Sequence, residues 1–237
     1  MFELLIKFFT AVLYNPLFNF LVLLYNYLPG HDFGLAIILL TIIIRVILYP
    51  ISVKSLNSQK TLQTLQPKIQ EIQNKYKNNK EQLAKETLSL YRQEKINPFS
   101  GLFLAIIQLP ILIALYTVFW KGLNPSELAN LYGFVSNPGQ INAIFLGIDL
   151  SRANLIFAVL AGIIQFFQTK MLMPKNEPSK TNNSDISQTI QKQMVYFFPF
   201  LTVFILMSLP SALGLYWIVS GIFSIIQQYF ILKQTKS

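Results

Sequence analysis

A single arginine, Arg45, lies inside the long apolar stretch 33–53. It follows Gly34 by about 16 Å along a helix that rises ~1.5 Å per residue. A charge at that depth in a membrane costs at least a few kcal/mol and usually faces protein or water. The apolar stretches contain no Asp or Glu to pair with it, and Lys54 is about 13 Å farther along, beyond the full reach of an Arg side chain. Arg45 is therefore predicted to face a water-filled space.

Other apolar stretches carry polar or small residues at helical spacing, which places them on one face of each helix. The candidate residues for lining a shared cavity are Thr41, Arg45, Gln108, Gln165, Gln168, Trp217, Ser220 and Ser224. Either Gln165 or Gln168 could face inward, and Trp217 could instead anchor the helix at the membrane surface. Close helix packing is the simpler explanation for Gly162 and Gly221. The amides and the cation together predict a hydrated, positively charged cavity.

The chain lacks the usual groups for covalent or redox chemistry. It contains no cysteine, which excludes disulfides, thiolate nucleophiles and cysteine-ligated metal centres. The one histidine, His31, stands beside Asp32 and has too few partners for a metal site. The sequence also has no P-loop, zinc motif, Ser/His pair or carboxylate relay within its apolar stretches. We therefore expect no enzymatic activity, no cofactor and no bound metal.

The composition places these residues in a membrane. Of 237 residues, 53% are hydrophobic and only 12% are charged, about half the charged share of a soluble domain. Apolar runs of about 18 or more residues predict transmembrane helices. The expected fold class is an all-α polytopic membrane protein. It has a five-helix transmembrane core, a cytoplasmic helical hairpin and an N-terminal interfacial helix.

Breaks in the apolar pattern define the expected segments. Asn15-Pro16 should break or restart a helix, so we expect an interfacial helix over 15–28. Residues 1–14 either span the membrane, lie on its surface or are cleaved. Pro210 divides the last apolar run into two spans. The segments are an N-terminal apolar segment at 1–32, a first span at 33–53, a hairpin at 54–96, and spans two to five within 97–237, with an external loop at 121–151, a cytoplasmic linker at 172–192 and a short C-terminal tail.

Basic residues are distributed unevenly along the chain. Fifteen of the nineteen Lys and Arg residues lie in 54–96, between 170 and 192, or after 232. Short loops rich in Lys and Arg stay on the cytoplasmic side of a membrane. The hairpin, the linker and the C-terminus are therefore predicted to be cytoplasmic. Membrane topology then explains the net charge of +9, and no nucleic-acid partner is required.

Four segments carry a resemblance to a known family: TIIIRVILYPIS at 41–52, LQPKIQEIQNKYKNNK at 65–80, NPFSGLFLAIIQLPILIALY at 97–116 and LPSALGLYWIVSGIFSIIQQ at 209–228. In order and content they resemble the YidC/Oxa/Alb family of membrane protein insertases, and the likeness covers nearly all of 15–233. Gly221 departs from the family, which often has Asn there, and slightly alters the polarity of the groove. No lipobox cysteine follows the N-terminus, which puts lipoprotein processing in doubt.

The resemblance implies a non-enzymatic insertase and chaperone of the bacterial cell membrane, in the small form without a large periplasmic domain. It implies a positively charged groove, open to cytoplasm and lipid, that admits nascent membrane proteins alone or together with the Sec translocon. The implied partners are nascent membrane proteins, the ribosome, the Sec translocon, the signal recognition receptor and lipids, with no sequence-specific nucleic acid.

The basic hairpin has two interpretations. The family resemblance makes it a contact for ribosome, receptor or client through Lys68, Lys75, Lys77, Lys80 and Arg92. The simpler interpretation is a solvated loop whose charge only sets topology. For the whole chain, two rival functions also use the same residues. One is a small solute channel or transporter built on the cavity, and the other is a structural subunit of a larger membrane complex.

Overall fold

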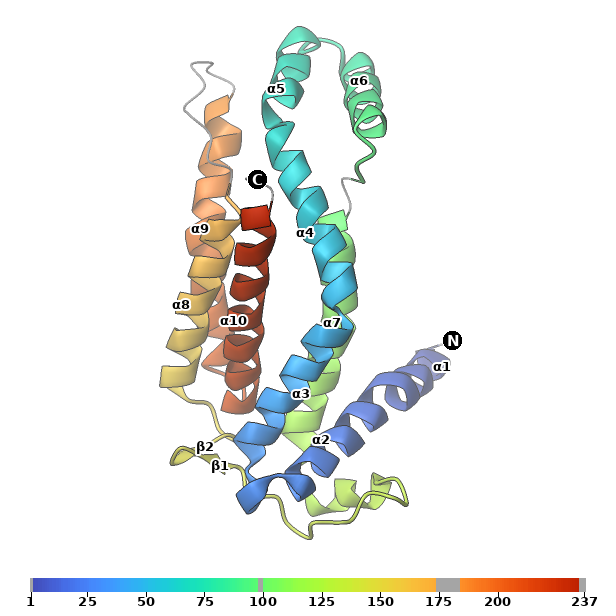
Figure 1. Ribbon diagram of the computed structural model, residues 1–237, viewed down its shortest axis with the longest axis vertical. Coiled ribbons are helices and arrows are strands. Elements are labelled where there is room, and N and C mark those ends of the chain that lie inside the picture. The colour runs from blue at the N-terminus through green and yellow to red at the C-terminus, as the bar shows by residue number, and fades with distance from the viewer. Residues whose placement is uncertain (1, 98–99, 174–183, 235–237) are drawn as a thin grey trace.

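The structure is a computed structural model that describes residues 2–97, 100–173 and 184–234. Its elements are almost all helical, and α3, α4, α7, α8, α9 and α10 run roughly along one long axis (Figure 1). In chain order they are α1 (Phe2–Phe9), the π-helical turn η1 (Thr10–Tyr14), α2 (Asn15–Tyr27), the 3-10 turn η2 (Pro29–His31), α3 (Phe33–Ile47), α4 (Tyr49–Thr64), α5 (Gln66–Lys75), α6 (Lys80–Gln93), α7 (Ser100–Lys121), the 3-10 helix η3 (Pro125–Asn130), β1 (Ile144–Phe145), β2 (Ile148–Asp149), α8 (Leu155–Met171), α9 (Ser184–Leu206) and α10 (Ser211–Gln234).

The N-terminal helix runs from α1 through η1 into α2 at an angle to the long axis (Figure 1). Pro16 lies in the first turn of α2, where its missing N–H costs little, and the π-helical turn η1 directly precedes it. Helix α2 is thus restarted where the sequence predicts, but without a loop. Phe18, Leu21 and Val22 of α2 are buried in the main core. The interfacial position of 15–28 stays a prediction, because Glu3–Tyr27 is long and apolar enough to cross a membrane.

The first predicted span is bent. Helix α3 ends at Ile47, and α4 begins at Tyr49 in a direction 63° away. Pro50 lies in the first turn of α4, and a proline disfavours α-helical geometry in the residue before it and cannot donate to the preceding turn. The continuous helix expected over 33–53 is therefore interrupted at Leu48, three residues after Arg45.

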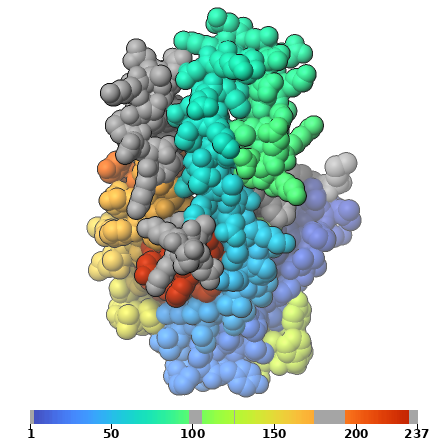
Figure 2. All heavy atoms as spheres, turned by 45° about the horizontal axis from the view of Figure 1, so that its top comes forward, coloured from blue at the N-terminus to red at the C-terminus, as the bar shows by residue number. Residues whose placement is uncertain are grey.

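The basic segment contains two further helices, α5 and α6, which lie alongside each other at one end of the molecule (Figures 1 and 2). Asn79 caps α6 by accepting a hydrogen bond from the Gln82 backbone N–H at 3.0 Å. Leu65 and Ile69 are buried, whereas Leu88 is exposed. The hairpin therefore has a thin apolar face, and its cytoplasmic location stays a prediction.

The remaining helices form the packed body of the protein. Helix α8 lies along both α9 and α10, and α10 also packs against α3. Fully buried side chains from these helices and from α2 and α7 share one core, among them Ile37, Leu115, Phe119 and Leu213. On the outside of α9, Phe200 and Phe204 are about three-quarters and two-thirds exposed. Such apolar surface is typical of a lipid or protein contact.

The length and apolar composition of each helix decide whether it can cross a membrane by itself. Among the described residues, Glu3–Tyr27 and Ser211–Ile231 are each long and apolar enough to span a membrane, and the bent pair α3–α4 adds a third segment if it counts as one span. Shorter apolar helices cover Ile106–Lys121, Leu155–Met171 and Gln193–Leu206. The structure is thus a helical protein with several apolar helices, and the five-span arrangement is taken up below as a proposal.

Close packing explains Gly162, as the simpler interpretation of this residue predicts. A Cβ atom there would lie 2.4 Å from Val203 Cγ2 on α9. We expect Gly162→Ala to destabilise the protein by about 1–3 kcal/mol through overpacking, measured as a lower unfolding temperature in detergent. Gly133→Ala is the matched control, since a Cβ there meets nothing within 4 Å. Equal unfolding temperatures for both variants would contradict close α8–α9 packing at this position.

Candidate functional site: a polar cavity around Arg45

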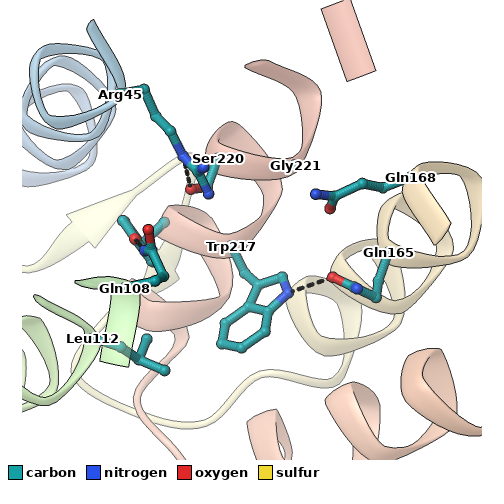
Figure 3. Close-up of a pocket in the computed structure, with 9 residues that line it drawn as sticks. Arg45, Gln108, Leu112, Gln165, Gln168, Trp217, Ser220 and Gly221 are labelled. Atoms are coloured by element: carbon teal, nitrogen blue, oxygen red, sulfur yellow. Dashed lines mark hydrogen bonds between the residues drawn. The ribbon is translucent and has the colours of Figure 1, made fainter. Parts of the chain in front are cut away.

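A cavity of about 110 Å³ lies between α3, α7, α8 and α10. Its lining includes one cation and three side-chain amides and consists of Arg45, Gln108, Leu112, Gln165, Gln168, Tyr216, Trp217, Ser220 and Gly221. Figure 3 shows these side chains converging on one space from helices far apart in the sequence. Six of the eight residues predicted to line a cavity are therefore brought together.

Arg45 is held by α10. Its Nε–H donates to Ser220 Oγ at 2.6 Å (Figure 3). Among the described residues the ion pairs are Lys68–Glu94 and Arg152–Asp149, so Arg45 has no carboxylate partner there. A guanidinium group carries five N–H donors, and described residues accept from only one of them. The cavity therefore presents a cation with unused hydrogen-bonding capacity.

Gln108 and Tyr216 join α7 to α10. The Gln108 side-chain amide donates to the Tyr216 hydroxyl, and Tyr216 is almost fully buried. Tyr216 was not among the predicted cavity residues. Its position four residues before Ser220 is the signal that could have identified it, because residues i and i+4 share a helix face.

Trp217 and Gln165 join α10 to α8. The indole Nε1–H donates to Gln165 Oε1 at 3.1 Å (Figure 3). Trp217 therefore lines the cavity. Its indole N–H is satisfied by Gln165 and does not need a partner at the membrane surface. Gln165 and Gln168 both line the cavity, so the alternative between them is resolved as both, with Gln165 bonded to Trp217.

Two predicted residues lie outside the cavity lining. Thr41 Oγ1 donates to the Ile37 carbonyl at 2.6 Å, and Ser224 Oγ donates to the Ser220 carbonyl at 2.9 Å. Both side chains are buried. Hydroxyls in helices often bond the carbonyl four residues earlier in this way, and a polar residue at the correct spacing then needs no cavity. Neither residue is part of this cavity's lining, and their contact with a client stays a prediction.

Gly221 allows α8 and α10 to approach closely beside the cavity. A Cβ atom there would lie 2.4 Å from Ile164 Cγ2 and 3.8 Å from Gln168 Oε1. The packing interpretation of this glycine is therefore confirmed. An asparagine side chain in its place would need Ile164 to move.

Backbone hydrogen bonds join the chain that follows β2 to the start of α10. The Ser211 N–H donates to the Arg152 carbonyl at 2.8 Å, and the Ala212 N–H donates to the Leu150 carbonyl at 3.0 Å. Hydrogen bonds from Ser151, together with the Arg152 charge, hold the pKa of Asp149 below its ordinary value. Pro210 itself is buried, whereas Met207 and Ser208 before it are exposed.

A second cavity, of about 400 Å³, lies between α2, α3 and the loop at 132–134 and is almost entirely apolar. It offers no charge to a polar ligand. Within the described part of the chain no cluster of three or more His, Cys, Asp or Glu residues could hold a metal ion. His31 Nδ1 lies 3.1 Å from the Tyr25 carbonyl instead. The Arg45 cavity is thus the better candidate for binding a polar group.

The predicted hairpin contacts lie in a different part of the molecule, at the α5–α6 end. Lys68, Lys75, Lys77, Lys80 and Arg92 are all exposed. Lys68 pairs with Glu94 at 3.0 Å, an exposed ion pair of the kind that contributes little to stability. Of the other basic residues counted in the topology argument, Lys175, Lys180 and Lys236 lie outside the described residues.

Comparison with known proteins identifies the family. Residues 23–237 match the family described as "60Kd inner membrane protein". A relative from Fusobacterium nucleatum named "Membrane protein insertase YidC" is 35% identical over 226 residues, covering 94% of this chain and 98% of its own. This chain belongs to the YidC family of inner membrane proteins. The family predicted from the four sequence segments is confirmed.

Other relatives place this chain among YidC proteins of different lengths. "Membrane protein insertase YidC 1" of Halalkalibacterium halodurans is 31% identical over 84% of this chain and 70% of its own. The YidC of Syntrophus aciditrophicus is 36% identical, and the match covers only 36% of it. A solved structure titled as an active YidC insertase matches 96% of this chain and 50% of that chain, with 27% identity and a TM-score of 0.59. Insertases of this family are not enzymes, in agreement with the sequence analysis.

The Tyr216 contact can be tested directly. We expect Tyr216→Phe to lower stability by about 1 kcal/mol, because it removes one hydrogen bond and leaves the Gln108 amide unpaired. The measurement is the unfolding temperature in detergent. Tyr229→Phe is the control on the same helix, since Tyr229 is about half exposed. An unchanged unfolding temperature for Tyr216→Phe would show that the bond to Gln108 contributes nothing.

Proposed function

We propose that the protein is a membrane protein insertase and chaperone that moves segments of nascent membrane proteins from the cytoplasm into the bilayer. The observation that carries the proposal is the Arg45 cation without a carboxylate partner among the described residues, in a cavity lined by amide and hydroxyl groups. The names of the relatives support the same activity.

The cavity is suited to the most costly part of insertion. Carrying a polar flank of a client through lipid leaves its polar groups without hydrogen bonds, at several kcal/mol for each group. Gln108, Gln165 and Gln168 offer replacement donors and acceptors, and Arg45 attracts acidic residues of the flank. Burial of the client's apolar helix in lipid, at about 25 cal/mol per Å², then favours its release. The membrane potential adds about 2.3 kcal/mol per charge per 100 mV.

The proposed membrane arrangement follows from charge. The exposed basic residues of α5 and α6 lie at one end of the molecule, and the loop 121–151 with β1 and β2 lies at the other (Figure 1). The positive-inside rule makes the hairpin end cytoplasmic. We place five spans in the bacterial cell membrane on this basis: the first built from α3 and the start of α4, and the others from α7, α8, α9 and α10. The C-terminus is then cytoplasmic.

The hairpin is proposed as the contact for cytoplasmic partners. Its exposed cations and thin apolar face suit an acidic partner surface more than a place in the core. The ribosome, a signal recognition receptor and the Sec translocon are the proposed partners, with nascent membrane proteins as clients.

The function is tested by reconstituting the purified chain into lipid vesicles with a short single-span client whose translocated flank is either acidic or neutral. A charge-assisted hydrogen bond contributes about 1.5–3 kcal/mol. We therefore expect Arg45→Ala to slow insertion of the acidic client roughly ten- to hundredfold and the neutral client much less. Arg45→Lys should retain much of the activity, because it keeps the charge.

Two controls separate the alternatives. Gln59→Ala changes a half-buried amide of α4, outside the cavity lining, that donates to Ser55 Oγ, and it should leave both clients unaffected. If the native chain inserts neither client, the insertase proposal is wrong. Solute leakage without insertion would favour the channel. Equal loss for both clients together with a lower unfolding temperature would make Arg45 a structural residue.

A further inference from the structure

The β-hairpin formed by β1 and β2, at the end of the molecule opposite α5 and α6, has an unusual turn. Strands β1 and β2 pair antiparallel, with Phe145 opposite Ile148, so Leu146 and Gly147 form a two-residue turn. Both have positive φ, +50° and +78°. Two-residue turns with positive φ at both positions strongly favour Asn, Asp or Gly. A leucine in this left-handed conformation is uncommon and strained.

The protein itself does not compensate for this strain by packing the leucine. The Leu146 side chain is 82% exposed, and its neighbour Ile144 is 56% exposed. A locally unfavourable residue that gains no contact within the fold indicates a role outside it. We call these two side chains the hairpin tip.

The hairpin is nevertheless firmly positioned. Phe145 packs so closely on the first turn of α3 that a Cβ at Gly34 would lie 2.1 Å from Phe145 Cγ. At the base of the hairpin, Leu150 is fully buried and its N–H donates to the Ala143 carbonyl at 2.9 Å. The hairpin tip is therefore held at a fixed height relative to α3 and to the start of α10.

The β-hairpin lies near the start of α8, whose first two residues are apolar and exposed. Helix α8 begins at Leu155, only six residues after β2 ends, and Leu155 and Ile156 are each 60% exposed. In Figure 1 the hairpin lies across the long axis of the molecule near the beginning of α8, rather than extending along that axis. The exposed Arg152, 3.3 Å from Asp149, lies between the two and marks a polar boundary. Exposed apolar residues of the hairpin tip and of the first turn of α8 thus flank the exposed Arg152 along the chain.

We propose that the hairpin tip, Ile144 and Leu146, inserts into the interfacial region of the outer leaflet and anchors this end of the protein to the membrane surface. Apolar side chains gain free energy at the headgroup–acyl boundary. Phe145 links the hairpin tip to α3, and Arg45 lies about 16 Å along that helix from Gly34. The anchor thereby sets the depth of Arg45 in the membrane. The proposal rests on the orientation proposed above and does not depend on insertase activity.

The test uses single-cysteine variants of the full chain, which has no native cysteine. Ile144→Cys and Leu146→Cys carry an environment-sensitive fluorophore in vesicles of phosphatidylcholine and phosphatidylglycerol with nitroxide-labelled lipid headgroups. Gln140→Cys, in the exposed polar turn that follows Gly139, is the control. We expect severalfold stronger quenching at both tip positions than at Gln140. Equal quenching at all three would overturn the proposal, whether water or another protein covers the hairpin tip.

A second variant separates anchoring from a structural role. Leu146→Asn in the Ile144→Cys background suits the positive φ of the turn, so the unfolding temperature in detergent should not fall. Quenching at position 144 should drop toward the Gln140 value, because the apolar side chain that holds the hairpin tip in lipid is gone. A lower unfolding temperature with unchanged quenching would instead make Leu146 a structural residue and contradict the anchor. Insertion of the neutral client, measured alongside, shows whether the insertase proposal stands independently.

Discussion

The guanidinium group of Arg45 is a single positive charge among apolar helices, and polar side chains of α7, α8 and α10 line the cavity beside it. Arg45 is the one charged residue of the apolar helix α3, where an isolated cation is costly. The structure offsets this cost with polar groups from three other helices instead of with a carboxylate. Ser220 accepts from the guanidinium group, and Gln108 and Gln165 bond to the neighbouring Tyr216 and Trp217. A carboxylate would neutralise the charge, whereas neutral amides and hydroxyls leave it available to a ligand.

The packing around the cavity supports that arrangement. The bend at Leu48 turns the chain directly after Arg45, and Gly221 allows α8 to approach α10 closely enough for Gln165 to reach Trp217. At the far end, the Leu150–Ala212 and Arg152–Ser211 backbone bonds hold the loop to the start of α10. These contacts join α8, α10 and the loop before α8 around the Arg45 cavity.

Much of this site could be predicted from the sequence because charge and amides are conspicuous in apolar stretches. Arg45, Gln108, Gln165, Gln168, Trp217 and Ser220 were identified from type and spacing alone. Thr41 and Ser224 have the same spacing but satisfy their hydroxyls within their own helices, which depends on side-chain rotamers that spacing does not specify. Tyr216 was missed because an aromatic residue in an apolar run is also an ordinary core residue.

The limits of prediction for the fold have similar causes. The hairpin helices and the Asn79 cap follow from local polar and turn residues, and α2 begins where Pro16 predicts. The bend at Leu48 could be expected near Pro50, but its 63° angle could not, because α4 packs on α7 and α10, which are distant in the sequence. Whether the N-terminal helix spans or lies in the interface depends on the bilayer, and its length and apolar composition permit both.

Arg45 is expected to face a hydrated space that water reaches from the end of the protein that carries α5 and α6. Single cysteines at positions 45, 108, 165 and 217, in a chain without native cysteine, can be treated in membranes with an impermeant thiol reagent applied from the cytoplasmic side. Val159→Cys, on the exposed apolar side of α8, is the lipid-facing control. We expect the four cavity positions to react and position 159 to remain unmodified. An unreactive position 45, with the other three reacting only from the opposite side, would contradict the account.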